Sequence, residues 1–342
     1  MILYEPSTPP PLKEYGIDIP IAPDAVKLAL DHLLNNPRFG PRREEWLRAA
    51  PAEPVTRELL ELVHDPAYVA RLLGEEAATE VIETYELIDR RGHYHRYDPQ
   101  EGNRPLREIV DQALRTTAGS VACCDIALSR GACFFLGGGM HHGKRDTGDG
   151  FCLVNDPVIA AKQCISEGKA KRVWIVDLDV HKGDGTAALT AEDPSIRTFS
   201  IHMAHRWPLD RPTYRSDGSL HPSHIPSDVD VPVGEREEDA YLPLLEDGLQ
   251  RMEEYGLPDL AIVLYGADPY DLDELPSSGG IRLTLRQMME RDSYVYTFFT
   301  EREVPLAYVK AGGYGNHAWE PLSQFLAYYL ERELPGIPQR ET

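Results

Sequence analysis

The chain has 342 residues, of which 42% are hydrophobic and 27% charged, an ordinary balance for a soluble globular protein. Its formal charge is −21, from 35 basic and 56 acidic side chains. A field of that sign repels nucleic-acid phosphates and attracts cationic molecules, although salt adaptation of the host explains such a charge equally well. The longest apolar runs, residues 132–136 and 260–264, are only strand-sized, so we expect neither nucleic-acid binding nor a membrane span.

Targeting signals and cysteines bear on the compartment. The N-terminus, MILYEPSTPPPLKEYG, lacks a basic region followed by a long apolar stretch, so no secretory signal is visible. The five cysteines form no CxxC pair, and their odd number argues against a complete disulfide framework. These features predict a cytoplasmic protein with reduced, mostly buried thiols.

Strand-like and helix-like segments alternate along the chain. The helix-like stretches include residues 156–167 and 240–255, and the strand-like runs are residues 132–136, 173–176, 197–201, 260–265 and 306–309. Such alternation predicts an α/β protein, a three-layer α/β/α single domain over residues 1–342 with a central, mostly parallel sheet. A proline-rich stretch, residues 208–232, predicts a long irregular loop.

Polar or glycine-rich clusters follow four of these strand-like runs. They comprise residues 137–142, 177–184, 266–268 and 312–314. In open α/β sheets, ligands bind outside the carboxyl ends of the strands. We therefore expect the four clusters to form one common site.

The second cluster has the composition of a metal site. Asp177, Asp179 and His181 share one face if the extended geometry of the preceding strand continues. Asp179 and His181, together with Asp268, give a carboxylate, imidazole and carboxylate set that leaves room for water, as catalytic metal sites do. Zinc is the natural choice, and ferrous iron accepts the same ligands.

The remaining polar residues predict acid–base chemistry beside this metal. Asp177 and Asp184 are placed to orient the ring nitrogens of His141 and His142. An imidazole backed by a carboxylate is the usual general base for activating water. Tyr314, beside two glycines, can donate a hydrogen bond to an oxyanion.

Four motifs, GGGMHHGKRDTGDGFCLVND, VDLDVHKGDG, YGADPYD and AGGYG, resemble the histone deacetylase family of the arginase/deacetylase superfamily. They stand in the family's order, and the resemblance covers residues 59–319. It implies zinc ligation by Asp179, His181 and Asp268. It also implies that His142 is the general base and acid, with His141 as its electrostatic partner.

The resemblance assigns the other site residues as well. It pairs Asp177 with His141 and Asp184 with His142, and aspartate at position 184 resembles class I deacetylases more than class II. Tyr314 would polarise the scissile carbonyl. The residues expected to contact substrate are Phe151 and Trp207 as opposite channel walls, Gly150, Gly313, and Asp98 in the rim loop of residues 84–103. The resemblance further implies structural potassium, bound by backbone oxygens around residues 177–181 and near Ser200.

Two departures from the family pattern affect substrate choice. Lys182 stands where a second histidine usually follows the metal histidine, and Gly16 stands where many relatives carry an arginine near an internal acetate-exit region. The paired Asp-x-His-x-Asp ligands of arginases are missing, which disfavours a binuclear manganese enzyme.

The resemblance implies a metal-dependent hydrolase of linear amides that removes acetyl or other acyl groups from N-ε-acyl-lysine. Its partner would then be an acylated protein. A small acetylated polyamine or diamine is an alternative substrate, hydrolysed by the same mechanism. A non-catalytic module that binds acyl-lysine is a second alternative. The sequence leaves open whether the chain forms an oligomer.

Overall fold

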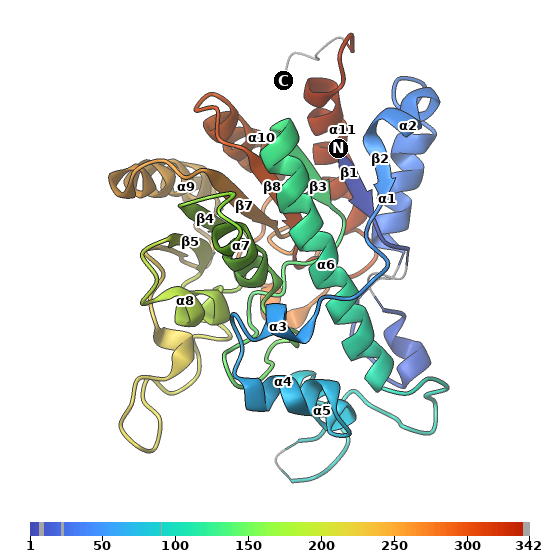
Figure 1. The fold of residues 1–342 in the computed structure, drawn as a ribbon, viewed down its shortest axis with the longest axis vertical. Coiled ribbons are helices and arrows are strands. Elements are labelled where there is room, and N and C mark those ends of the chain that lie inside the picture. Colours follow the sequence, from blue (N-terminus) through green and yellow to red (C-terminus); the bar gives the residue numbers. More distant parts are fainter. Residues whose placement is uncertain (7–9, 22–23, 90, 338–342) are drawn as a thin grey trace.

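A single parallel sheet organises the chain (Figure 1). The computed structural model describes residues 1–6, 10–21, 24–89 and 91–337. Within them, eight strands pair in the order β2-β1-β3-β8-β7-β4-β5-β6, and every pairing is parallel. The strands are β1 (Ile2–Tyr4), β2 (Leu47–Ala49), β3 (Ala132–Phe135), β4 (Val173–Asp177), β5 (Ile196–Met203), β6 (Val229–Val233), β7 (Leu260–Tyr265) and β8 (Leu306–Lys310).

Helices cover both faces of the sheet, because the central strands bury alternate side chains on opposite sides. In β8, Leu306 and Tyr308 pack with one group of helices, and Ala307 and Val309 pack with the other. The first group comprises α1 (Ala25–Leu34), α9 (Glu238–Met252), α10 (Leu285–Thr300) and α11 (Trp319–Glu333). The second comprises α4 (Pro66–Leu73), α5 (Ala77–Thr84), α6 (Arg107–Arg130) and α7 (Asp156–Ser166). This arrangement confirms the predicted three-layer α/β/α fold.

Short helices complete the described chain. They are α2 (Arg43–Trp46), α3 (Arg57–Leu60) and α8 (Asp184–Thr190), with 3-10 turns at Leu12–Tyr15, Gly40–Arg42, Pro222–His224, Glu253–Tyr255 and Pro276–Ser278. Figure 1 shows the long helix α6 crossing the sheet beside α7, with α4 and α5 beyond the lower end of the sheet. None of the helices in the described ranges combines the length and apolarity needed to cross a bilayer.

One local prediction is wrong: the proline-rich stretch is not irregular throughout. Strand β6 begins at Val229 and includes Pro232. Proline lacks the N–H that a ladder needs, which normally excludes it from a central strand. Strand β6 is the last strand of the sheet, so one of its edges has no neighbouring strand. A proline is tolerated there, because its missing N–H costs no hydrogen bond on that open edge.

Candidate active site

Three buried side chains at the carboxyl ends of β4 and β7 form a candidate metal centre. Asp179, His181 and Asp268 each offer a ligand atom, and these atoms lie within 4.8 Å of one another. Nδ1 of His181 is 3.1 Å from Oδ1 of Asp179 and 3.2 Å from Oδ2 of Asp268. The structure thus brings together the three residues that the sequence proposes as ligands.

The chemistry of this cluster fits a divalent cation. Oδ2 of Asp268 is buried and accepts no hydrogen bond from the described residues. Burial, and then the neighbouring charge of Asp179, raise the pKa of Asp268 to about 8, because two ionised carboxylates this close repel each other. A divalent cation would relieve that repulsion, and Gly312 leaves space beside both groups: a Cβ there would lie 2.5 Å from Oδ2 of both Asp179 and Asp268. Two carboxylates and one imidazole leave positions open for water and substrate.

Each residue of the histidine pair has its own carboxylate partner. Nδ1 of His141 lies 2.6 Å from Oδ2 of Asp177, and Nδ1 of His142 lies 2.7 Å from Oδ1 of Asp184. Strand β4 ends at Asp177, where Oδ1 of that residue accepts a hydrogen bond of 3.0 Å from the Asp179 backbone N–H. The extended geometry therefore does not continue, and Asp177 faces His141 while Asp179 and His181 face Asp268.

The two imidazoles have opposite pKa shifts. Burial, and then the adjacent His141, lower the pKa of His142 to about 4. Burial also acts to lower the pKa of His141, but Asp177 and Asp179 outweigh it and raise that pKa to about 9. At neutral pH His141 is therefore protonated and His142 is neutral. Since Nδ1 of His142 faces Asp184, its Nε2 is left as the proton acceptor.

Aromatic side chains surround these histidines. Phe151, Gly150 and Gly313 line a cavity of about 170 Å³ that also contains His141, His142 and Asp179. The ring centroid of Trp207 is 4.5 Å from that of His142. Gly150 permits this contact, because a Cβ there would meet the indole of Trp207 at 2.3 Å. Phe151, Gly150 and Gly313 thus share a cavity with His142, whereas Trp207 contacts the His142 ring without lining that cavity.

Tyr314 follows β8 and lines the same cavity. Its backbone N–H donates to Oδ2 of Asp273 at 2.7 Å, which fixes the turn. Burial raises the pKa of the phenol well above its ordinary value, so the hydroxyl stays protonated. This hydroxyl has no hydrogen-bond partner among the described residues, which leaves it free to donate to a ligand in the cavity.

The structure places Asp98 apart from the other candidate residues. Asp98 is exposed, its Oδ1 accepts from the Gln100 backbone N–H at 2.8 Å, and its own N–H donates to the Gly16 carbonyl at 2.8 Å. Neither Asp98 nor Gly16 lines the cavity. A Cβ on Gly16 would lie 2.1 Å from the Asp98 carbonyl oxygen, so the close packing of these two backbones requires glycine.

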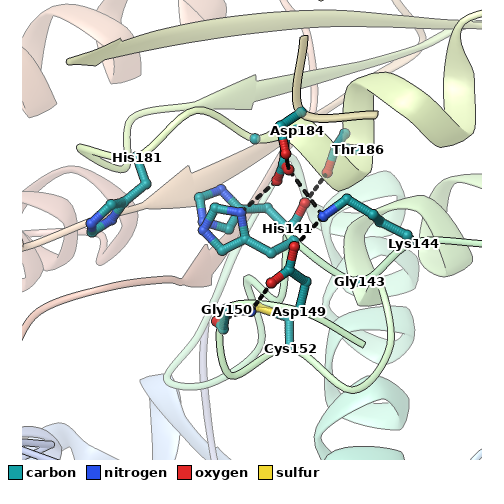
Figure 2. Close-up of polar contacts among 12 residues, drawn as sticks. His141, Gly143, Lys144, Asp149, Gly150, Cys152, His181, Asp184 and Thr186 are labelled. Atoms are coloured by element: carbon teal, nitrogen blue, oxygen red, sulfur yellow. Dashed lines mark hydrogen bonds and ion pairs between the residues drawn. The ribbon is translucent and has the colours of Figure 1, made fainter. Parts of the chain in front are cut away.

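Sequence reasoning missed a charged network around Asp184 (Figure 2). Nζ of Lys144 lies 3.0 Å from Oδ2 of Asp184 and also forms an ion pair with Asp149. Arg211 donates to Oδ1 of Asp149 at 2.8 Å, and Ser223 donates to Oδ2 of Asp184 at 2.7 Å. Lys144 stands inside the motif that contains the histidine pair, so the sequence could have suggested it as a partner of Asp184. Arg211 and Ser223 lie in a loop that carries no motif.

We expect Lys144→Met to lower the free energy of unfolding by about 3 kcal/mol, since it removes the lysine cation from the fully buried carboxylate of Asp184, whereas Asp149 keeps Arg211. Urea unfolding of the purified protein measures this. Lys169→Met is the matched control, because Lys169 pairs with Asp125 and Glu167 while 41% exposed and should cost less than about 1 kcal/mol. Equal losses in the two variants would contradict a structural role for the buried network.

Comparisons with known proteins agree with this architecture. The crystal structure of an HDA15 HD domain superposes with a TM-score of 0.67 at 18% identity, covering 98% of this chain and 90% of that one. The eight-stranded parallel sheet flanked by helices, together with this structural match, fits the α/β arginase/deacetylase fold.

The chain belongs to the histone deacetylase family: the family's histone deacetylase domain matches residues 19–330. An uncharacterized protein of a Picosynechococcus species is 30% identical over 261 residues, which are 76% of this chain and 77% of the relative. Histone deacetylase 2 of Arabidopsis thaliana is 28% identical, covering 58% of this chain and 49% of that protein. The acetoin utilization protein AcuC of Bacillus subtilis is 32% identical, covering 41% and 36%. Family membership supports a hydrolase of the deacetylase type.

Proposed function

We propose that the chain is a zinc-dependent amidohydrolase that removes acetyl or other acyl groups from N-ε-acyl-lysine side chains. The observation that carries this proposal is one cavity lined by three groups: Asp179 of the buried Asp179, His181 and Asp268 cluster, a neutral His142, and Tyr314, whose hydroxyl has no partner among the described residues. Ferrous iron accepts the same ligands.

The residues divide the chemistry among themselves. A divalent metal held by the triad would polarise the amide carbonyl and acidify a water molecule. Nε2 of the neutral His142 accepts the proton of the attacking water and then returns it to the leaving amine. Asp184 holds the ring by its Nδ1–H, and the cation on His141 keeps the pKa of His142 low. The Tyr314 hydroxyl donates to the oxyanion.

The walls of the cavity select the substrate in this proposal. Phe151 and Trp207 would enclose the aliphatic chain of an acylated lysine, with Gly150 and Gly313 giving the substrate room to approach. Asp98 is kept as a rim-loop candidate that would bind substrate backbone, and its exposure is compatible with that role.

A small acetylated polyamine is the second candidate substrate, favoured by the net charge of −21, which attracts cations. The test is a comparison of kcat/KM for an acetyl-lysine peptide, acetylspermidine and acetylcadaverine, using protein reconstituted with zinc. Faster turnover of the peptide supports the lysine deacylase. Faster turnover of the small acetylated amines supports an acetylpolyamine amidohydrolase instead. If the zinc-bound protein hydrolyses none of these amides, the remaining hypothesis is a non-catalytic module that binds acyl-lysine.

Because His142 must be neutral to accept a proton, we expect kcat/KM to hold as pH falls from 7 to about 5 and to drop near pH 4, following the lowered pKa of His142. A pH–rate profile measures this, with the zinc content determined at each pH so that metal loss is not mistaken for protonation. A midpoint near 6.5, the ordinary value for histidine, would contradict the depressed pKa.

Three further assignments belong to the same proposal. Structural potassium would lie near residues 177–181, where Ser200 pairs in register with Asp177 and its hydroxyl accepts from the Gly183 backbone N–H at 3.4 Å. The five cysteines are all free and buried, which fits a reducing cytoplasmic compartment. We regard residues 1–342 as one catalytic unit, since helices α1 and α11 pack together on the same sheet.

A further inference from the structure

The candidate channel wall Phe151 stands at the tip of a tight turn. At the base of this turn the Asp149 N–H donates to the Cys152 carbonyl at 3.1 Å, and the Cys152 N–H donates to the Asp149 carbonyl at 2.8 Å. The two residues at the tip, Gly150 and Phe151, have φ angles of +50° and +67°. A bulky side chain such as that of Phe151 rarely adopts this left-handed conformation, so the surrounding structure must hold the turn.

The carboxylate of Asp149 connects this turn to the segment that carries the other candidate wall, Trp207. Oδ1 of Asp149 accepts from the Gly150 backbone N–H at 3.0 Å and from Nη2 of Arg211 at 2.8 Å, and Nη1 of Arg211 donates to Oδ2. Cζ of Arg211 also lies 5.2 Å from the centroid of the Trp207 ring, within the range of a cation–π contact. One guanidinium therefore contacts a side chain of each wall segment.

The pair formed by Arg211 and Asp149 is suited to fix a distance. Their side chains are only 23% and 12% exposed. Burial acts to raise the pKa of the Asp149 carboxyl, but the hydrogen bond from Arg211 and the charge of Lys144 outweigh it and lower that pKa, so Asp149 is ionised at neutral pH. A planar guanidinium that binds a carboxylate through two hydrogen bonds restricts both the separation and the orientation of the two groups.

We propose that the Arg211–Asp149 ion pair sets the width of the substrate channel by holding Phe151 and Trp207 at a fixed separation. The inference rests on the proposed function and deepens it, since it assigns the selection of a slim aliphatic stem to two residues that do not line the cavity. Arg211 is then a positioning residue, which acts through the walls and not on the reacting atoms. A channel held at this width accepts the stem of acyl-lysine and disfavours a stem that contains a ring.

The turnover arm compares two peptides on zinc-loaded protein. One contains acetyl-lysine, and the other contains 4-(acetamidomethyl)phenylalanine, in which a phenyl ring replaces part of the aliphatic stem. Arg211→Met should lower the ratio of kcat/KM for the slim over the wide peptide by about tenfold, the lower end of what a fitted pocket achieves against one extra methylene. Asp149→Asn is a second variant that alters the other partner, and it should lower the ratio likewise.

Two further variants serve as comparisons. Arg211→Lys keeps the positive charge but lacks the planar fork, so its ratio should lie between those of Arg211→Met and the unaltered protein. Arg206→Met is the matched control, because Arg206 precedes Trp207 in the same segment and pairs with the exposed Glu235. Its ratio should equal that of the unaltered protein.

A spectroscopic arm observes Trp207 without any substrate. The four tryptophans are replaced by 5-fluorotryptophan, and Trp207→Phe identifies the fluorine resonance of that residue. Arg211→Met should shift or broaden the Trp207 resonance, because the indole loses its guanidinium contact and its fixed position. The resonances of Trp46 and Trp174, which are buried in the core, should stay unchanged and report an intact fold.

A lower turnover ratio together with a changed Trp207 resonance, in Arg211→Met and not in Arg206→Met, supports the proposal. An unchanged ratio overturns it, whether or not the resonance moves. A lower ratio with an unchanged Trp207 resonance also overturns it, because that wall has then stayed in place. If the unaltered protein cleaves neither peptide, the proposed function fails, and the fluorine resonance alone decides whether Arg211 holds Trp207.

Discussion

Replacing His142 with alanine should lower kcat by about a hundredfold to ten-thousandfold, the usual contribution of a positioned general base. The physical reason is the state of this ring. Burial and the cation on His141 lower its pKa to about 4, and Asp184 occupies its Nδ1. Nε2 is therefore an available proton acceptor at neutral pH. Steady-state kinetics on an acetyl-lysine peptide measures the loss.

The control for this variant is His32→Ala, because His32 is an exposed residue of α1 that packs near Trp319 and does not line the cavity. It should retain normal kinetics. Zinc content should be unchanged in both variants, since His142 is not one of the three clustered ligands. A His142→Ala protein with full metal content and nearly normal kcat would require a different base.

Replacing Tyr314 with phenylalanine should lower kcat by about a hundredfold to a thousandfold, the cost of removing one oxyanion donor. The hydroxyl is protonated, lines the cavity with Asp179 and His142, and has no hydrogen-bond partner in the described part of the chain. Since no described residue bonds to that hydroxyl, the folded state should be little affected. Kinetics together with thermal unfolding would separate the two effects.

Tyr255→Phe serves as the comparison, since Tyr255 is 37% exposed and lies outside the cavity. Its kinetics should be unchanged. Should Tyr314→Phe lower the unfolding temperature and leave kcat intact, the hydroxyl would have a structural role and the oxyanion assignment would fall.

Much of the fold could be predicted from hydrophobic pattern. The five strand-like runs each form a strand, because central parallel strands are buried on both faces and read as continuous apolar segments. Strands β1 and β2, three residues each, were missed, since so short a run carries no periodicity. Strand β6 was missed because Pro232 argues against a strand unless the strand is known to lie at an edge.

The motifs likewise identified residues that the structure brings close to the candidate metal ligands, because carboxyl ends of neighbouring strands meet at one edge of the sheet. The partners of Asp184 were harder to anticipate. Ser223 and Lys144 reach its second oxygen from segments far apart in the sequence.

The measurement that tests the account most directly is hydrolysis of an acetyl-lysine peptide as a function of bound zinc. Protein stripped by a chelator should show no turnover, and activity should rise in proportion to zinc up to one ion per chain. Asp268→Ala should neither bind zinc tightly nor hydrolyse the peptide, because it removes one of three clustered ligands. Undiminished turnover by the metal-free protein, or by a metal-free Asp268→Ala variant, would contradict the account.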